Sequence, residues 1–259
     1  MEKVLDFKDY HSWMPIIKNI ADKYDNQQLI DKFKNHDTYL EIYDIKELVG
    51  ESIINEVFDF ISEYYSDIVF YHATATNDLN SYLENGLIPM NVERMNQYAR
   101  DIFNEKDFPE INNEIFQKAL DAQNIERRKG IICFAFDKDE LLEDNSSHYL
   151  IYGSEYVMNI SQYLGTEANE YPKYLEEKLT PTILKCKIST TDLDKEIIKS
   201  ISDNIIIRYF ENIIYTNEKL PVIYINPYLE KALDSKNILD YEHPTNIKCN
   251  IKKVMYGYY

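Results

Sequence analysis

Histidine, cysteine, serine, tyrosine and glutamate side chains interrupt several apolar stretches of this sequence, and such residues perform acid–base and nucleophilic chemistry. Cys133 and His148 could form a thiol nucleophile and its imidazole base. Cys133 lies, however, within the apolar run IICFAF with no helix start after it, which favours a buried small hydrophobic residue. The sequence has no P-loop, GxGxxG or HExxH motif and no metal-ligand spacing. Any catalytic group must therefore combine residues that lie further apart in the sequence.

Three short stretches follow one another in an informative order. The first is YHAT at residues 71–74, followed by a helical pattern that ends at Gly86 and Leu87. The second is GIICFA at 130–135, which leads through a polar turn to SSHY at 146–149. The third is ENIIY at 211–215. Their order and spacing resemble the histidine-tyrosine-glutamate branch of the ADP-ribosyltransferase superfamily, which includes poly(ADP-ribose) polymerases, RNA 2′-phosphotransferases and several bacterial toxins.

The resemblance covers about residues 67–226 and includes two departures from the family pattern. Family members carry His-Gly-Ser or His-Gly-Thr on the first strand, where the glycine backbone holds the nicotinamide amide. Ala73 stands at that glycine position and brings a Cβ atom close to the ring. Ile132 stands where the family strand has tyrosine, so Tyr149 or Tyr152 would have to supply the stacking ring.

The resemblance implies that NAD is the substrate and that no metal is needed. Breaking the bond between nicotinamide and ribose creates an oxocarbenium-like centre, which a preorganised negative charge stabilises by roughly 10²–10³ in rate. By resemblance, His72 would hydrogen-bond the ribose, Tyr149 would stack on nicotinamide, and Glu211 would bind the 2′-hydroxyl and stabilise the cation. The further residues expected to bind NAD are Ala73, Thr74, Arg94, Ser146, Ser147 and Tyr152.

Each of these residues also has a purely structural interpretation. His72 on an apolar strand could be a core histidine, and Tyr149 is one of 23 tyrosines. Glu211 could be a solvated carboxylate at a strand end. Glu155 is its rival for the catalytic role, because YGSEY resembles a turn that enters a helix, although a carboxylate there could instead complement the helix N-terminus.

The two other histidines near these motifs remain open. His148 is either a second-layer residue behind the site or a surface residue. His243 precedes Pro244 in a turn, which favours a structural role.

The elements that would position these residues suggest an α+β fold with a mixed or antiparallel sheet. Residues 68–73 and 131–136 are predicted to be strands of one sheet, with a helix over 77–85 that ends at Gly86. Residues 182–188 alternate as a half-buried strand does. Further strands are predicted at 204–209, 213–215 and 222–225, and a final edge strand within HPTNIKCNIKKVMY.

Two helical regions flank this predicted sheet. Residues 1–66 form a helical N-terminal region that packs on the sheet, and residues 67–259 form the ADP-ribosyltransferase-like domain. Residues 91–128 read as a helical insertion in that domain. We expect an arginine among Arg94, Arg127 and Arg128 to face the NAD diphosphate, because the guanidinium fork matches phosphate oxygens.

Composition limits the cellular setting. The net charge of −17 repels phosphate backbones and favours a protein acceptor over nucleic acid. No apolar run approaches the roughly 18 residues of a membrane helix, and the N-terminus does not resemble a signal peptide. Three scattered cysteines suit a reducing cytoplasm.

Two functions from different classes are compatible with these observations. The first is an NAD-consuming mono-ADP-ribosyltransferase, and the resemblance associates such stand-alone domains with toxins, effectors and phage-defence factors. The second is a non-catalytic protein that binds a nucleotide or a partner on the same fold, which the Ala73 and Ile132 departures favour.

Overall fold

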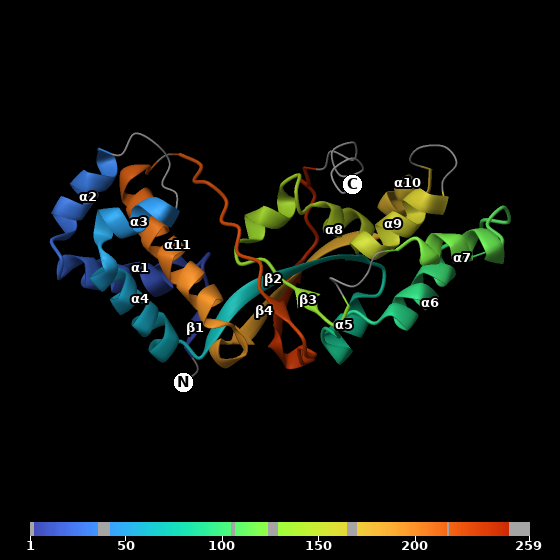
Figure 1. The fold of residues 1–259 in the computed structure, drawn as a ribbon, viewed down its shortest axis with the longest axis horizontal. Coiled ribbons are helices and arrows are strands. Elements are labelled where there is room, and N and C mark those ends of the chain that lie inside the picture. The colour runs from blue at the N-terminus through green and yellow to red at the C-terminus, as the bar shows by residue number, and fades with distance from the viewer. Residues whose placement is uncertain are drawn as a thin grey trace. The chain divides into compact units, whose positions relative to one another are not determined.

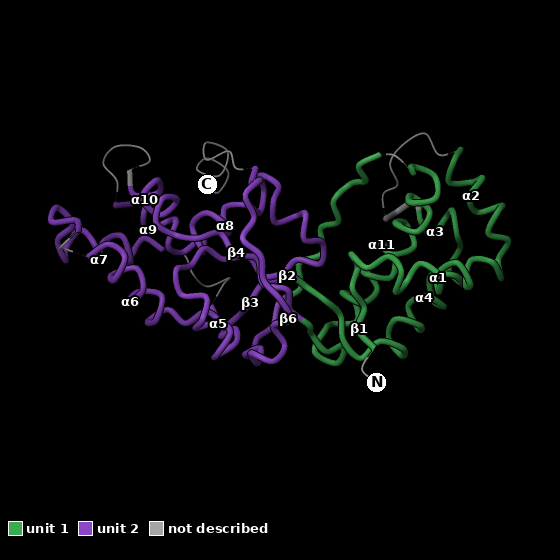
Figure 2. Tube along the Cα trace, turned by 180° about the vertical axis from the view of Figure 1, so that it is seen from behind, with its two compact units in different colours: residues 1–70, 187–227 green, residues 71–186, 228–259 purple. Residues whose placement is uncertain are grey.

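The computed structural model describes residues 3–35, 42–104, 107–123, 129–164, 170–216 and 218–248. These residues form an α+β fold with a mixed four-stranded sheet (Figure 1), as the sequence predicted for the class. The chain divides into two compact units, coloured separately in Figure 2. Unit 1 comprises residues 1–70 and 187–227, and unit 2 comprises residues 71–186 and 228–259.

Unit 1 is a helical unit built around one buried helix. Its N-terminal part contains β1 (Val4–Leu5), α1 (Tyr10–Asp22), α2 (Asn26–Lys34), α3 (Ile42–Val49) and α4 (Glu51–Tyr64). Helix α4 begins directly after Gly50. These four helices pack against α11 (Lys195–Ile214), which belongs to the last third of the chain.

Helix α11 corrects the strands predicted at 204–209 and 213–215. All residues from Ile201 to Glu211 are buried, so the helix shows almost no amphipathic period. An apolar run without periodicity cannot be distinguished from a buried strand by its pattern, and the isoleucines of NIIIRY favoured the strand. Burial on every side is instead what a central helix requires.

The four-stranded sheet has the order β1-β2-β4-β6. Strand β2 (Asp67–Thr76) runs parallel to β1, and β4 (Thr180–Ser189) runs antiparallel to β6 (Ile238–Glu242). The strands predicted at 68–73 and 182–188 are thus confirmed. The edge strand β6 precedes the segment in which the final strand was predicted. The described part of that segment, residues 243–248, has no strand, and residues 249–256 lie outside the described ranges.

The predicted strand IICFAF is only partly confirmed. Residues Ile132–Cys133 form β3, which pairs with β5 (Tyr228–Leu229) in a separate two-stranded sheet. Ala135 bridges to Tyr71 of β2 through two backbone hydrogen bonds of 2.8 Å. Residues 222–225 were also predicted as a strand but form none. Buried and more exposed side chains nevertheless alternate along them. The β-forming residues of VIYI therefore predicted the wrong element there.

Helix α5 (Leu79–Asn85) confirms the helix predicted after β2. It ends at Gly86, whose φ of +75° lies in the region that favours glycine. A Cβ on Gly86 would lie 2.0 Å from the carbonyl oxygen of Leu233. Leu87 and Leu233 exchange two backbone hydrogen bonds of 2.9 Å, so this turn is held tightly against the chain segment after β5.

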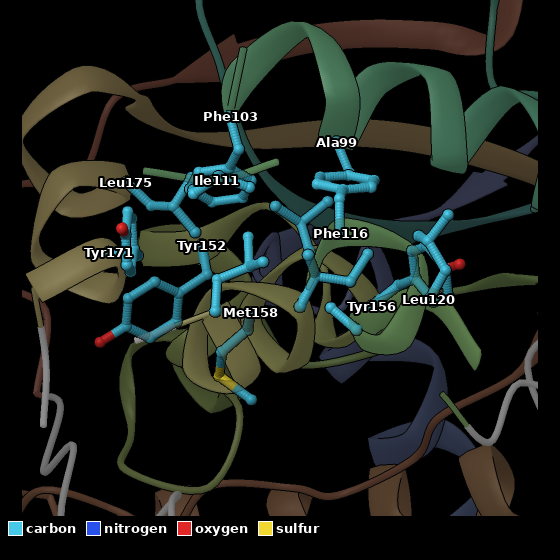
Figure 3. Close-up of a cluster of buried hydrophobic side chains, with 14 of the residues drawn as sticks. Ala99, Phe103, Ile111, Phe116, Leu120, Tyr152, Tyr156, Met158, Tyr171 and Leu175 are labelled. Carbon is cyan, nitrogen blue, oxygen red and sulfur yellow. The ribbon is translucent and has the colours of Figure 1, made fainter. Parts of the chain in front are cut away.

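The other helices of unit 2 surround a second hydrophobic core. They are α6 (Val92–Ile102), α7 (Asn113–Asp121), α8 (His148–Tyr152), α9 (Glu155–Leu164) and α10 (Glu170–Lys178). Figure 3 shows side chains from these elements, including Phe103, Phe116 and Tyr152, packed together. The described part of the predicted insertion 91–128 is therefore helical and contributes to a core that it shares with α8–α10.

Candidate active site

His72 lies in the middle of β2 in unit 2, where a neighbouring strand orients its ring. Its Nδ1 is 2.9 Å from the carbonyl oxygen of Cys133, and Phe134 lies beside the ring with a centroid distance of 5.8 Å. Burial lowers the pKa of His72, and the hydrogen bond to Cys133 opposes that effect. The ring is therefore uncharged at neutral pH. Because a carbonyl only accepts, Nδ1 carries the proton, and Nε2 is left with a lone pair that can accept from a hydroxyl.

The residues that follow His72 on β2 are hydrogen-bonded to residues in and just before α5. Thr74 is buried, and its Oγ1 lies 3.2 Å from the hydroxyl of Tyr82. Thr76 Oγ1 accepts a hydrogen bond from the backbone N–H of Asp78, whose carboxylate in turn caps α5. Ala73 is also buried, with 7% of its surface exposed. These hydrogen bonds tie the end of β2 to the start of α5.

A second group of polar side chains gathers where α8 ends and α9 begins. Tyr149 donates its hydroxyl to Glu155 Oε1 at 2.8 Å, and His148 Nε2 lies 3.4 Å from the same oxygen. The rings of His148 and Tyr149 are in contact, with centroids 4.1 Å apart. The carboxylate beside Tyr149 is therefore that of Glu155.

Gly153 brings this turn against β2. Its φ is +77°, and an added Cβ would lie 2.8 Å from the carbonyl oxygen of Ala75. Ala75 follows His72 by three residues, which is about 10 Å along an extended strand. The turn that carries Glu155 is thus packed directly on the strand that carries His72.

Replacing Gly153 by alanine should loosen this contact. Alanine at positive φ typically costs about 1 kcal/mol, and Gly130→Ala serves as the control because Gly130 has φ of +78° with no atom within 4 Å of an added Cβ. The crowding against Ala75 should add about 1–3 kcal/mol for Gly153→Ala. Urea unfolding of both variants measures the difference, and equal losses of stability would mean that the turn does not press on β2.

The serines expected to bind nicotinamide are already engaged within the chain. Ser147 is fully buried and donates to the carbonyl oxygen of Lys248 at 2.5 Å, while Ser146 donates to Glu140 at 3.3 Å. Lys248 also contacts both carboxylate oxygens of Glu143 at 2.9 Å. The expectation that Ser147 is available to a ligand is therefore wrong, because its side chain is buried and its hydroxyl is bonded to Lys248 within unit 2.

The position of Glu211 corrects the predicted catalytic site. It lies on α11 in unit 1 instead of on a strand, with 3% of its surface exposed. Its Oε2 is 3.5 Å from Arg208 Nε, and Arg208 also donates to the carbonyl of Pro221. Burial raises the pKa of Glu211, and Arg208 opposes that rise. This environment is that of a buried structural ion pair.

Tyr152 and the arginines complete the predicted set. Tyr152 has 1% of its surface exposed and fills the core of unit 2 (Figure 3), so it cannot supply a stacking ring to a ligand. Arg94 lies exposed in the first turn of α6, where its backbone N–H is capped by Asn91. Arg127 and Arg128 lie outside the described residues.

The pairing of Tyr149 with Glu155 was the part of the site that the motifs did not predict. The two residues are six positions apart, which does not match the spacing of neighbours on one continuous helix. The signal in the sequence is Gly153 between them, since a glycine at positive φ breaks the helix and folds α9 back toward α8.

Within the described ranges, no helix combines the length and apolar composition that a membrane-spanning segment needs. The same residues contain no cluster of three or more His, Cys, Asp or Glu placed to hold a metal ion. Comparisons with protein-family models, with curated proteins and with solved structures gave no match to this chain.

Proposed function

We propose that unit 2 binds NAD and transfers its ADP-ribose to a macromolecular acceptor, with Glu155 as the catalytic carboxylate. The observation that carries the proposal is the packing of the YGSE turn on β2. The turn carries Glu155, whose carboxylate is held by Tyr149, and β2 carries His72, whose ring is uncharged and hydrogen-bonded to Cys133. The order of the motifs along the chain supports the same reaction class.

Each side chain has a role that its geometry allows. His72 Nε2 accepts a hydrogen bond from a ribose hydroxyl, since Nδ1 donates to Cys133. Tyr149 presents a partly exposed ring to nicotinamide while its hydroxyl holds Glu155. Glu155 places negative charge near the ribose carbon, where positive charge develops as the bond breaks.

The bond changes balance without a metal or a redox partner. The C–N bond between ribose and nicotinamide breaks, and its electron pair leaves with nicotinamide, which thereby becomes neutral. A nucleophilic atom of the acceptor forms the new bond to the ribose carbon and loses its proton to solvent. The net charge of −17 favours a protein acceptor over a nucleic acid. A toxin, effector or phage-defence role is part of this proposal.

The competing function is a non-catalytic protein that binds nucleotide at the same place. Buried Ala73 at the family's glycine position and the engaged hydroxyl of Ser147 favour it, because both reduce the contacts offered to nicotinamide. Incubation with NAD labelled in the adenosine part and a cell lysate separates the two. Label on a macromolecule with release of nicotinamide supports the transferase, and reversible NAD binding without release supports the competitor.

His72→Ala should weaken both NAD binding and turnover. The ribose hydrogen bond exists in the ground state, and a net loss of about 1.4 kcal/mol corresponds to tenfold weaker affinity. His243→Ala is the matched control, because His243 is bonded to the carbonyl of Pro181, remote in sequence from these motifs. Calorimetric titration with NAD measures the affinity. Equal affinities of the two variants would remove His72 from the binding site.

A further inference from the structure

His148 is a buried imidazole without a hydrogen bond. Its side chain is 2% exposed, and neither ring nitrogen has a hydrogen-bond partner among the described residues. Buried polar groups are almost always paired, so an exception calls for a physical reason.

The nearest polar atom to consider is Glu155 Oε1, which is 3.4 Å from His148 Nε2. The contact is within ionic range, but its geometry is not that of a hydrogen bond. Tyr149 donates to the same oxygen at 2.8 Å. The Glu155 side chain is 20% exposed and that of His148 only 2%, so the histidine approaches the carboxylate from inside the protein.

We propose that His148 is a positioning residue whose Nε2–H donates to Glu155 Oε1 in the NAD complex. The inference rests on the proposed function of Glu155. A glutamate side chain has three rotatable bonds, and two donors from different directions on one oxygen restrict them. Catalytic hydrogen bonds are often long in a free enzyme and shorten in the complex, which fits the distance of 3.4 Å.

No proton is transferred by His148 in this role. Its Nε2–H remains on the ring, and the carboxylate keeps the charge that stabilises the cationic ribose. His148 and Tyr149 thereby fix where that charge lies, and a carboxylate displaced by about 1 Å can lose on the order of 10²-fold in rate.

Two substitutions of His148 distinguish the effect of its hydrogen-bond donor from that of its aromatic ring. His148→Phe keeps an aromatic ring against Tyr149 but removes the donor, whereas His148→Gln places an amide N–H near the position of Nε2. With the purified protein and NAD, we expect His148→Phe to lower kcat by about 10- to 10²-fold with KM little changed. His148→Gln should recover most of that loss, which a purely structural role would not predict.

A spectroscopic measurement keeps the inference testable if His148→Phe does not fold. The ¹⁵N resonance of His148 Nε2 should move on addition of NAD to the wild type, and this movement should be absent in Glu155→Ala. A resonance that moves equally in both proteins overturns the inference. A fully active His148→Phe overturns it as well. A wild type that releases no nicotinamide overturns the proposed function and this inference together.

Discussion

Glu155→Gln should reduce nicotinamide release by about 10²-fold or more while leaving NAD affinity nearly unchanged. Glutamine preserves the size of the side chain and an oxygen that accepts from Tyr149. It removes only the negative charge, which acts mainly when the ribose becomes cationic. An interaction stronger in the transition state than in the ground state appears in kcat and not in binding. Release of nicotinamide under saturating NAD measures the effect.

Glu211→Gln is the matched control for that substitution. It makes the same chemical change at the carboxylate that the motif order favoured, but Glu211 lies buried on α11 beside Arg208. We expect its folded fraction to release nicotinamide at the wild-type rate. A loss of turnover in Glu211→Gln together with an active Glu155→Gln would return the catalytic role to Glu211.

Arg208→Leu should destabilise unit 1 by about 3–5 kcal/mol, because it leaves the buried carboxylate of Glu211 without its cation. The side chains of Arg208 and Glu211 are 5% and 4% exposed, so water cannot replace the lost partner. The variant also loses the hydrogen bond to the carbonyl of Pro221 and the contact of the guanidinium with the Phe7 ring, at 5.5 Å. Chemical denaturation followed by circular dichroism of the helices measures the loss.

The destabilisation should depend on pH with a defined sign. Burial already raises the pKa of Glu211 in the folded protein, and removing Arg208 removes the influence that lowers it. A carboxyl group whose pKa is higher in the folded than in the unfolded protein binds more protons in the folded state. The free energy of unfolding therefore falls as pH rises from the unfolded pKa of about 4.3 through the pKa of the folded protein. Arg208→Leu should therefore be closer to the wild type at pH 4 than at pH 7.

A double variant identifies the group responsible for this pH dependence. Asp203 on the same helix also has a pKa raised by burial, but it is present in both proteins and cancels in the comparison. Adding Glu211→Gln to Arg208→Leu should remove the extra pH dependence and recover part of the stability. If the difference between Arg208→Leu and the wild type were the same at pH 4 and pH 7, Glu211 would not be the buried charge that matters.

Local patterns predicted the elements around His72 well. Strand β2 has the β-branched and aromatic residues of a central strand, and α5 ends at the glycine that the pattern required. These are features whose cause lies within a few residues, so the sequence displays them directly.

The pattern failed where tertiary packing decides the structure. The residues of α11 from Ile201 to Glu211 are buried on every side because α1–α4 pack around the helix, and no period remained to distinguish helix from strand. Because of that single error, Glu211 was predicted at a strand, whereas it lies on a buried helix. Glu155 was recognised as a rival, but its pairing with Tyr149 depends on the chain reversal at Gly153, which spacing along one helix does not predict.

The position of α11 in the chain has a consequence for the order of events during synthesis. Helix α4 ends at Tyr64 and α11 begins at Lys195, so residues 65–194, a stretch of 130, are made between them. At about 5–20 residues per second, this interval lasts roughly 7 to 26 s on the ribosome. Throughout it, the apolar faces of α1–α4 lack the helix that buries them. Unit 1 can therefore complete its core only after α11 has been made, even though its first helices emerge early.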